Sequence, residues 1–244
     1  SYMSVTYGAG GGTSEYTLKI ADNLKKKGVP ILAHLSCVSS TKKEIHQKLK
    51  DLQNAGIENI LALRGDMPDG MDVSHLEYHY ASQLIKEIVK FGGFCIGGAC
   101  YPEGHPESEN GFADIEHLKE KVEAGCEFLT TQMFFDNNIY YNFLYRLQSA
   151  GVSVPVIAGI MPVTNPSSIK RICKISGTAL PQRFVRIVDK FGNNPEAMKQ
   201  AGIAYATEQI IDLFANGVKA VHVYSMNKPD VAAKIQENLS EILK

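Results

Sequence analysis

The segment LALRGDMP at residues 61–68 decides the fold class, because an apolar run stops abruptly at the polar triplet RGD at 64–66. The same pattern recurs in GGACYPEGHP at 97–106 and in LTTQMFFD at 129–136, where apolar runs again end in polar and aromatic residues. Parallel strands that carry polar groups at their carboxyl ends are what a barrel enzyme needs to build an active site. The three segments therefore predict an enzyme of the α/β class.

Short apolar segments alternate with amphipathic helical segments along the 244 residues. Most apolar segments are continuous runs, which is typical of parallel strands covered by helices. Strands are expected at 4–7, 31–35, 59–63, 95–99, 128–133, 155–160 and 220–224. Helices are expected at 13–27, 41–55, 79–91, 112–125, 137–150, 165–176, 195–216 and 229–243. A capping box of Thr41 and Glu44 marks the start of the second of these helices.

Repeated strand–helix units can form an open doubly wound sheet or a closed (β/α)8 barrel, the TIM barrel. The barrel is favoured because the units follow one another at roughly 30-residue spacing and the polar clusters come from many strands. The glycine-rich turn at 8–12 lacks the GxGxxG spacing of a dinucleotide-binding fold. A closed barrel has eight strands, so seven predict that the first strand and helix are missing from this chain. Residues 1–244 are expected to form a single barrel domain.

The composition argues against several classes of function. The net charge of −1 gives no indication of a nucleic-acid or membrane-surface partner. No apolar run is long enough to cross a bilayer, and the first residues lack the form of a signal peptide. The five cysteines form no CxxC pair, which argues against a metal cluster or a disulfide framework and indicates the reducing cytoplasm.

The polar triplet offers chemistry at the end of its strand. Arg64 can bind phosphate through paired donors, and Asp66 can stabilise a developing cation or tune a flavin. The alternative is an ordinary turn, because glycine and aspartate favour turns. His34, at the end of the preceding strand, is either a ligand-binding residue or a satisfied residue of the core.

Further candidates follow the next strands. Tyr101 and His105 lie in a loop stiffened by two prolines and can stack on a ring or contact a phosphate, unless the loop is only a rigid surface. Asp114 and Lys121 share one helix face, although most such charges are simply solvated. Gln132 lies in an apolar strand, where a buried amide needs a ligand or a neighbouring strand as its partner. Its sequence neighbours are not expected to satisfy it, because side chains alternate across a strand.

Seven motifs, in the same order along the chain, resemble the catalytic domain of methylenetetrahydrofolate reductases of the bacterial MetF type. They cover nearly the whole chain, and an ordered set is far more specific than any single motif. The motifs are SVTYGAGGG at 4–12, AHLSC at 33–37, LALRGDMP at 61–68, YPEGHPE at 101–107, TQMFFD at 131–136, GIMPVTN at 159–165 and VYSMNK at 223–228.

The resemblance implies a flavin-containing barrel that binds FAD at the carboxyl ends of its strands. Arg64 and Lys121 would then meet the pyrophosphate, and Asp114 the ribose hydroxyls. The positions that match the family's cofactor-binding residues are Thr6, Tyr7, Ala9, His34, Arg64, Gly65, Asp66, Tyr80, Ala81, Tyr101, His105, Asp114, His117 and Lys121. The positions that match its folate-binding residues are Asp66, Gln132, Tyr224 and Lys228.

The implied reaction belongs to one-carbon metabolism and methionine biosynthesis, and its two halves share one site. NADH or NADPH reduces the flavin at N5 and leaves. Methylenetetrahydrofolate then binds, opens to a five-iminium cation and receives the hydride, which gives methyltetrahydrofolate. Asp66 would stabilise that cation, and ping-pong kinetics would follow. A homo-oligomer is expected.

Three departures from the family bear on activity, and one of them is Ile172, which stands where some relatives have a phenylalanine against the substrate. The family's general-acid glutamate lies on the first strand, which is missing here, so no residue takes that role and weak folate reduction is expected. Lys228 stands where members commonly have arginine, which keeps the charge but loses the planar fork. Two alternatives stay open: the same fold and flavin with electrons from a partner subunit, or a folate-binding module without redox activity.

Overall fold

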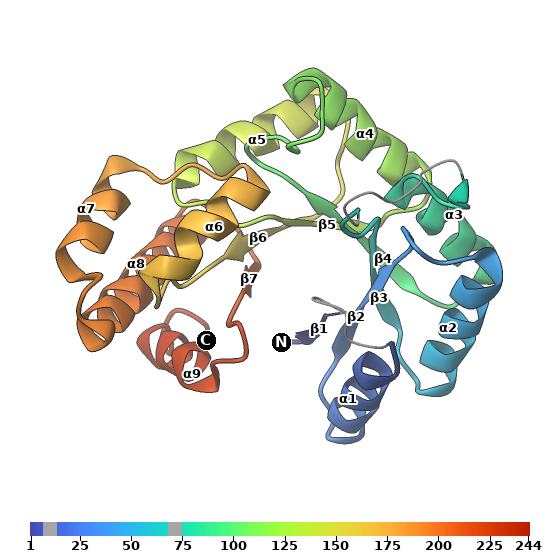
Figure 1. The fold of residues 1–244 in the computed structure, drawn as a ribbon, viewed down its shortest axis with the longest axis horizontal. Coiled ribbons are helices and arrows are strands. Elements are labelled where there is room, and N and C mark those ends of the chain that lie inside the picture. The colour runs from blue at the N-terminus through green and yellow to red at the C-terminus, as the bar shows by residue number, and fades with distance from the viewer. Residues whose placement is uncertain (7–13, 68–74) are drawn as a thin grey trace. The chain divides into compact units, whose positions relative to one another are not determined.

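Strands and helices alternate along the chain, as the apolar pattern predicts (Figure 1). The computed structural model describes residues 1–6, 14–67 and 75–244. The strands in these ranges are β1 (Met3–Val5), β2 (Ile31–Ser36), β3 (Asn59–Leu63), β4 (Cys95–Cys100), β5 (Phe128–Thr131), β6 (Val156–Ile160) and β7 (Val221–Val223). The helices are α1 (Ser14–Lys26), α2 (Lys42–Asn54), α3 (Ala81–Phe91), α4 (Gly111–Glu123), α5 (Asn137–Ser149), α6 (Pro166–Ser176), α7 (Gln182–Phe191), α8 (Pro195–Ala215) and α9 (Pro229–Asn238).

The chain divides into two compact units. The first unit contains Ser1–Ala99 and His117–Leu129, and the second contains Cys100–Glu116 and Thr130–Lys244.

The sheet of the first unit is parallel and follows the order β1-β2-β3-β4. Ser36 pairs with Leu63 in the register of β2 and β3, so the carboxyl ends of these two strands lie at one edge. Figure 1 shows α1, α2 and α3 along one side of these strands. Consecutive residues such as Leu32 and Ala33 of β2, and Leu61 and Ala62 of β3, are buried, which is the pattern of parallel strands covered on both faces.

The second helix begins at the predicted capping box. The side-chain oxygen of Thr41 accepts a hydrogen bond of 3.2 Å from the backbone amide of Glu44, whose carboxylate accepts one of 2.7 Å from the amide of Thr41. Two of the amides that a helix start leaves unpaired are thereby satisfied. The sequence signal for this helix is confirmed.

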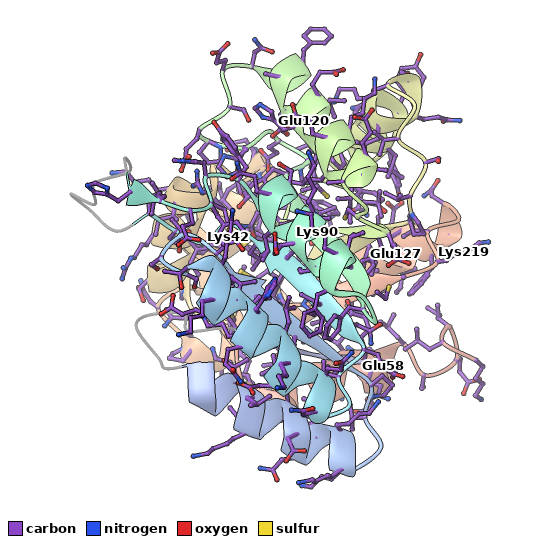
Figure 2. The ribbon with its side chains drawn as sticks, turned by 90° about the vertical axis from the view of Figure 1, so that its right-hand side faces the viewer. Lys42, Glu58, Lys90, Glu120, Glu127 and Lys219 are labelled. Carbon is purple, nitrogen blue, oxygen red and sulfur yellow. The ribbon has the colours of Figure 1, made fainter. Side chains whose placement is uncertain are left out.

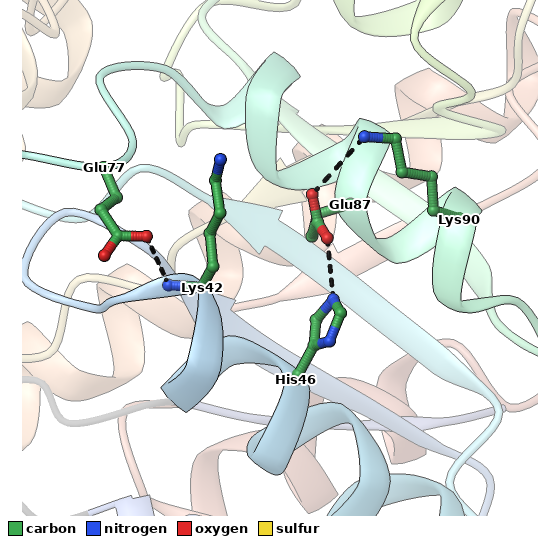
Figure 3. Close-up of polar contacts among 5 residues, drawn as sticks. All are labelled: Lys42, His46, Glu77, Glu87 and Lys90. Carbon is green, nitrogen blue, oxygen red and sulfur yellow. Dashed lines mark hydrogen bonds and ion pairs between the residues drawn. The ribbon is translucent and has the colours of Figure 1, made fainter.

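The outer surface of the first unit carries charges of both signs. Figure 3 shows His46 of α2 beside Glu87 of α3, with 2.7 Å between Nε2 and Oε1, and Lys90 at 3.8 Å from the same carboxylate. Figure 2 labels further exposed charged residues, of which Glu58 forms an ion pair of 3.1 Å with Lys25. The exposed pair of Lys25 and Glu58 contributes little to stability, so the buried strand residues hold the unit together.

The second unit contains the parallel pair β6 and β7, in which Gly159 lies opposite His222. Three helices, α6 to α8, separate these strands, whereas the sequence pattern predicts only two. The missed helix is α7, in which Phe184 and Val188 are buried one helical turn apart. That spacing is a helical signal, but it extends over only ten residues.

The core of the second unit forms where α8 packs on the strands. Gly202 of α8 is essential to this packing, because a β-carbon there would collide with the carbonyl oxygen of Val163. Buried residues of this core include Met198, Ile203, Ile210 and Leu213 of α8, and Phe134, Tyr140 and Ile160 from other segments. In the described ranges, no helix has both the length and the apolar composition that crossing a membrane requires.

Candidate functional site

The polar triplet of the first unit lies directly after β3, at the carboxyl edge of the sheet, as predicted. The backbone carbonyl of Arg64 accepts hydrogen bonds from the amides of Cys37 at 3.1 Å and Val38 at 2.8 Å. These bonds tie the turn after β3 to the segment that follows β2. The side chain of Asp66 is exposed beyond this turn. The turn therefore presents a carboxylate from a fixed backbone.

Gly65 has a backbone conformation that only glycine adopts easily, with φ of 91°. A β-carbon at this position would lie 3.1 Å from Cγ1 of Val38 and 3.2 Å from Cβ of Ser36. The Arg64 Nε donates a hydrogen bond of 3.2 Å to the carbonyl of Gly65. The positive φ therefore favours glycine between the arginine and the aspartate, and a side chain there would also press on Val38 and Ser36.

His34 of β2 is half-buried, and its Nε2 lies 2.5 Å from the hydroxyl oxygen of Ser4 on β1. Ser4 faces the same side of the sheet, because it pairs with Leu32, two residues before His34. The carbonyl of Thr6 accepts a hydrogen bond of 3.0 Å from the buried Thr17. Two predicted cofactor residues, Tyr7 and Ala9, lie outside the described residues.

The helices of the first unit supply the other predicted residues. Lys121 of α4 donates a hydrogen bond of 2.9 Å from its ammonium to the carbonyl of Ala99, at the end of β4. Its charged group therefore lies at the carboxyl end of a strand. Tyr80, the N-cap of α3, and His117 of α4 are exposed, whereas Ala81 is buried at the first position of α3.

In the second unit, Tyr101 and His105 pack edge to face, with ring centroids 4.6 Å apart. The His105 Nδ1 accepts a hydrogen bond of 3.1 Å from the amide of Glu107. A neutral ring therefore carries its proton on Nε2, as a donor. The two rings predicted to bind a ligand thus lie in contact with each other in this loop.

Asp114, in the first turn of α4, is only 7% exposed, so it is not the solvated charge that its position on a helix would suggest by default. Its Oδ1 accepts a hydrogen bond of 3.1 Å from the hydroxyl of Ser108. Ser108 belongs to the segment that follows the Tyr101 loop. The carboxylate is thus held against that segment.

Gln132 follows the end of β5 directly, and its side-chain oxygen accepts a hydrogen bond of 3.0 Å from the amide of Met133. The expectation that no sequence neighbour could satisfy this amide was wrong. Alternation keeps the side chains of neighbouring strand residues apart. It does not prevent a side chain from bonding to the next backbone N–H once the strand has ended. The backbone of Gln132 in turn donates a hydrogen bond of 2.7 Å to the carbonyl of Cys100.

Tyr224 follows the end of β7, and its hydroxyl donates a hydrogen bond of 2.6 Å to the carbonyl of Thr131. Its ring covers Gly159, where a β-carbon would lie 2.7 Å from Cε2 of the tyrosine. The hydroxyl of Thr131 accepts a hydrogen bond of 2.8 Å from the amide of Gly159. Thr131, the residue before Gln132, is therefore hydrogen-bonded to both Gly159 of β6 and Tyr224 after β7.

A cavity of about 270 Å³ opens beside Lys228 in the second unit. Its walls are the segment after β6, helix α6 and the segment after β7, including Met161, Val163, Ile169, Ile172 and Met226. Lys228 donates a hydrogen bond of 2.5 Å to the hydroxyl of Thr164 at the cavity. Met226 and Asn227 have φ of 51° and 57°, a left-handed conformation that is uncommon for residues other than glycine. Apolar walls with one cation suit a flat ligand that bears an anionic group.

Many of the predicted residues lie on strands near their carboxyl ends, or on segments that follow those ends. In the first unit, the groups at the carboxyl ends of the strands are those of His34, Arg64, Gly65, Asp66 and Lys121. In the second unit, they are those of Tyr101, His105, Gln132, Tyr224 and Lys228. Thr131, Thr164 and Glu103 were missed, although the rule that polar residues follow strand ends would have flagged each of them.

Alternating parallel strands and helices, with charged groups at the strand ends, define an α/β chain of the barrel type. The family model for methylenetetrahydrofolate reductase matches residues 1–240. The 5,10-methylenetetrahydrofolate reductase of Escherichia coli is 35% identical over 98% of this chain and 80% of that protein. Methylenetetrahydrofolate reductase (NADH) 1 of Zea mays is 34% identical over 99% of this chain, which spans only 43% of that protein. The chain belongs to the methylenetetrahydrofolate reductase family.

Solved structures support the fold. An uncharacterized protein from Clostridium thermocellum that binds two copies of 5-methyl-5,6,7,8-tetrahydrofolic acid matches with a TM-score of 0.61 at 14% identity, over 99% of this chain and 94% of that one. A 2,3-dimethylmalate lyase matches with a TM-score of 0.50 at 10% identity, over 98% of this chain and 72% of that one. The predicted fold class, a TIM-barrel-like chain with one unit fewer than eight, is confirmed. The family membership likewise confirms the prediction of an oxidoreductase.

Proposed function

We propose that this chain binds FAD and uses NADH or NADPH to reduce 5,10-methylenetetrahydrofolate to 5-methyltetrahydrofolate. The observation that carries the proposal is the turn after β3, where Gly65 lets Arg64 and Asp66 follow the strand end within a chain of this family. Flavin, when bound, supplies the hydride that passes from the nicotinamide to the folate. The residues of the chain bind and orient the reactants and stabilise charge.

The donor chemistry of the described residues fits a flavin dinucleotide. In the first unit, Arg64 offers a guanidinium, and Lys121 an ammonium fixed at the end of β4. Both suit a pyrophosphate. In the second unit, the buried carboxylate of Asp114 suits ribose hydroxyls, and His105 presents an N–H beside the flat ring of Tyr101. Thr6, Tyr7, Ala9, His34, Tyr80, Ala81 and His117 complete the proposed cofactor set.

The folate is proposed to bind in the second unit. Gln132 would pair with the edge of the pterin, because a side-chain amide offers both a donor and an acceptor. Lys228 would attract the carboxylates of the folate tail. Tyr224 lies on the segment between them, and the apolar walls of the cavity suit the flat part of the ligand.

Asp66 is proposed to act in catalysis through its charge. Methylenetetrahydrofolate must open to an iminium cation before it accepts a hydride, and a carboxylate beside that cation lowers its free energy. Asp66 is exposed on a rigid turn, so its charge is placed without reorganisation of the backbone. It is thus the one residue assigned to both the cofactor and the folate.

The organisation of the protein follows from the same proposal. Because one family model spans residues 1–240, we infer that both units belong to a single catalytic domain, 1–244. We also propose a cytoplasmic homo-oligomer. The described structure contains five free cysteines, four of them buried, which agrees with a reducing compartment.

An anaerobic titration tests the function. Addition of NADH to the FAD-loaded chain is expected to bleach the flavin, and subsequent methylenetetrahydrofolate is expected to restore its absorbance. If NADH and NADPH fail to bleach the flavin, but methylenetetrahydrofolate restores the absorbance of chemically reduced flavin, the result would favour electrons from a partner subunit. Folate binding without any change in the flavin spectrum would favour a folate-binding module.

A further inference from the structure

The loop that carries Tyr101 and His105 is fixed to the rest of the second unit at three points. Arg146 of α5 donates a hydrogen bond of 2.7 Å to the carbonyl of Pro102. The carboxylate of Glu103 accepts one of 2.9 Å from the amide of Ala179. Pro106 packs on Gly177, where a β-carbon would lie 3.3 Å from its ring. Two of the three contacts are therefore made with the segment that follows α6, at Gly177 and Ala179.

Glu103 is an unusual residue at this position. Its Oε2 accepts the bond from Ala179, whereas its Oε1 is buried and has no hydrogen-bond partner among the described residues. Burial first, and then the nearby charge of Asp136, raise the pKa of Glu103. The residue is half-buried, and a buried carboxylate oxygen without a partner is costly to maintain.

The hydrogen bond of Glu103 connects the Tyr101 loop to a segment that is continuous with the cavity wall. Ala179 lies three residues after the end of α6, and α6 contributes Ile169 and Ile172 to the cavity wall. The same segment is attached to the strand ends, because the hydroxyl of Thr178 donates a hydrogen bond of 3.3 Å to the carbonyl of Met133. A movement of α6 would therefore displace Ala179, and with it Glu103 and the Tyr101 loop.

We propose that Glu103 is a positioning residue that couples the loop of Tyr101 and His105 to helix α6, so that a ligand in the cavity and a ligand on the loop affect each other's binding. The identity of the two ligands, folate and FAD, rests on the proposed function. Coupling of this kind is reciprocal: each ligand tightens the other by the same factor. No contact between Glu103 and either ligand is needed.

Hydrogen–deuterium exchange of the whole chain tests the link without any ligand. Glu103→Ala is expected to raise exchange in residues 101–108 and 177–182 about tenfold, as loss of a charge-assisted hydrogen bond allows. Glu103→Gln keeps an acceptor for Ala179 and is expected to stay near wild type. Glu109→Gln, an exposed glutamate in the next segment, is the matched control and should change neither region.

The second readout is the coupling itself, measured as the affinity for FAD with and without 5-methyltetrahydrofolate. In the wild type the folate is expected to tighten FAD binding several-fold. Glu103→Ala should abolish that change while both ligands still bind. Unchanged exchange in Glu103→Ala, or coupling that survives in it, would overturn the proposal. If the wild type binds neither ligand, the proposed function fails, and the exchange experiment still decides whether Glu103 holds the loop.

Discussion

The hydroxyl of Tyr224 donates a 2.6 Å hydrogen bond to the backbone carbonyl of Thr131, a residue 93 positions earlier in the chain. Thr131 immediately precedes Gln132, the residue proposed to read the pterin. The tyrosine therefore fixes the backbone from which the glutamine projects. A β-carbon at Gly159 would collide with both its ring and the carbonyl oxygen of Thr131. The resemblance assigns Tyr224 to the folate, and the geometry adds a role in positioning Gln132.

Replacement of Tyr224 by phenylalanine removes only this hydrogen bond. We expect a loss of about 1 kcal/mol in the free energy of unfolding and a KM for folate raised about fivefold, because Gln132 loses its fixed backbone. FAD affinity should not change. Urea denaturation and steady-state kinetics measure these effects. Tyr145→Phe is the control, since Tyr145 is 72% exposed on α5. Equal effects of both substitutions would contradict the positioning role.

Gly65→Ala is expected to destabilise the chain by about 1–3 kcal/mol, since it places a side chain at φ of 91° against Val38. Gly28→Ala separates the effect of the positive φ from that of crowding, because Gly28 has φ of 79° but no atom within 4 Å of the added carbon. Thermal unfolding of both variants gives the comparison. A Gly65→Ala protein as stable as Gly28→Ala would show that crowding by Val38 contributes nothing.

Asp66→Asn keeps the shape of the side chain and removes its charge. The variant is expected to bind FAD and be reduced by NADH nearly normally, whereas folate reduction slows about a hundredfold, because only that half-reaction develops a cation. Stopped-flow spectroscopy of each half-reaction measures the difference. Asp189→Asn, at an exposed position of α7, is the control. The electrostatic role is rejected if both half-reactions slow by the same factor.

Thr164 orients Lys228 at the rim of the cavity through a 2.5 Å hydrogen bond. Thr164→Val should raise the Kd for 5-methyltetrahydrofolate about threefold, and Lys228→Met about tenfold, because the second change also removes the charge. Isothermal titration measures both. The effect of Lys228→Met should shrink at high salt, as expected for an ionic contact. A salt-independent loss would point to packing instead.

Alkaline pH should destabilise the fold through its buried thiols. Burial raises the pKa of Cys37, Cys126 and Cys173 from 9.0 to about 11, although the charge of Arg64 partly opposes this at Cys37. The unfolded chain therefore loses these protons first as the pH rises, so the thiols' contribution to stability is complete below pH 9 and disappears as the pH approaches 11. Urea midpoints from pH 8 to pH 11 measure the decline. Replacement of Cys173 by alanine should make the decline of the urea midpoint with pH shallower. An unchanged decline would contradict the role of the buried thiol.

Local patterns in the sequence predicted most of the fold. Continuous apolar runs located β2, β3, β4 and β6 to within one residue, and the Thr41–Glu44 box located the start of α2. The expected strand at 128–133 ends earlier, at Thr131, and the expected helix at 229–243 ends at Asn238. Strand and helix ends are decided by tertiary contacts, which periodicity does not contain.

The details of the site depended on contacts between distant residues. The sequence placed Arg64 and Asp66 at a strand end, because an apolar run stops there. It could not reveal that Glu103 accepts from Ala179, 76 residues away, or that Thr164 orients Lys228. These partners are set by which loops meet at the carboxyl ends of the strands. Residue types predicted the candidates, and the fold determined their partners.

The central claim, that this chain is a flavoprotein, is tested most directly by its visible absorbance spectrum. The purified chain is incubated with excess FAD and passed through a desalting column. We predict that the protein fraction keeps a flavin band between about 350 and 500 nm, and that Arg64→Ala with Lys121→Ala loses it, because the pyrophosphate contacts are gone. A wild-type protein that leaves the column colourless would contradict the account.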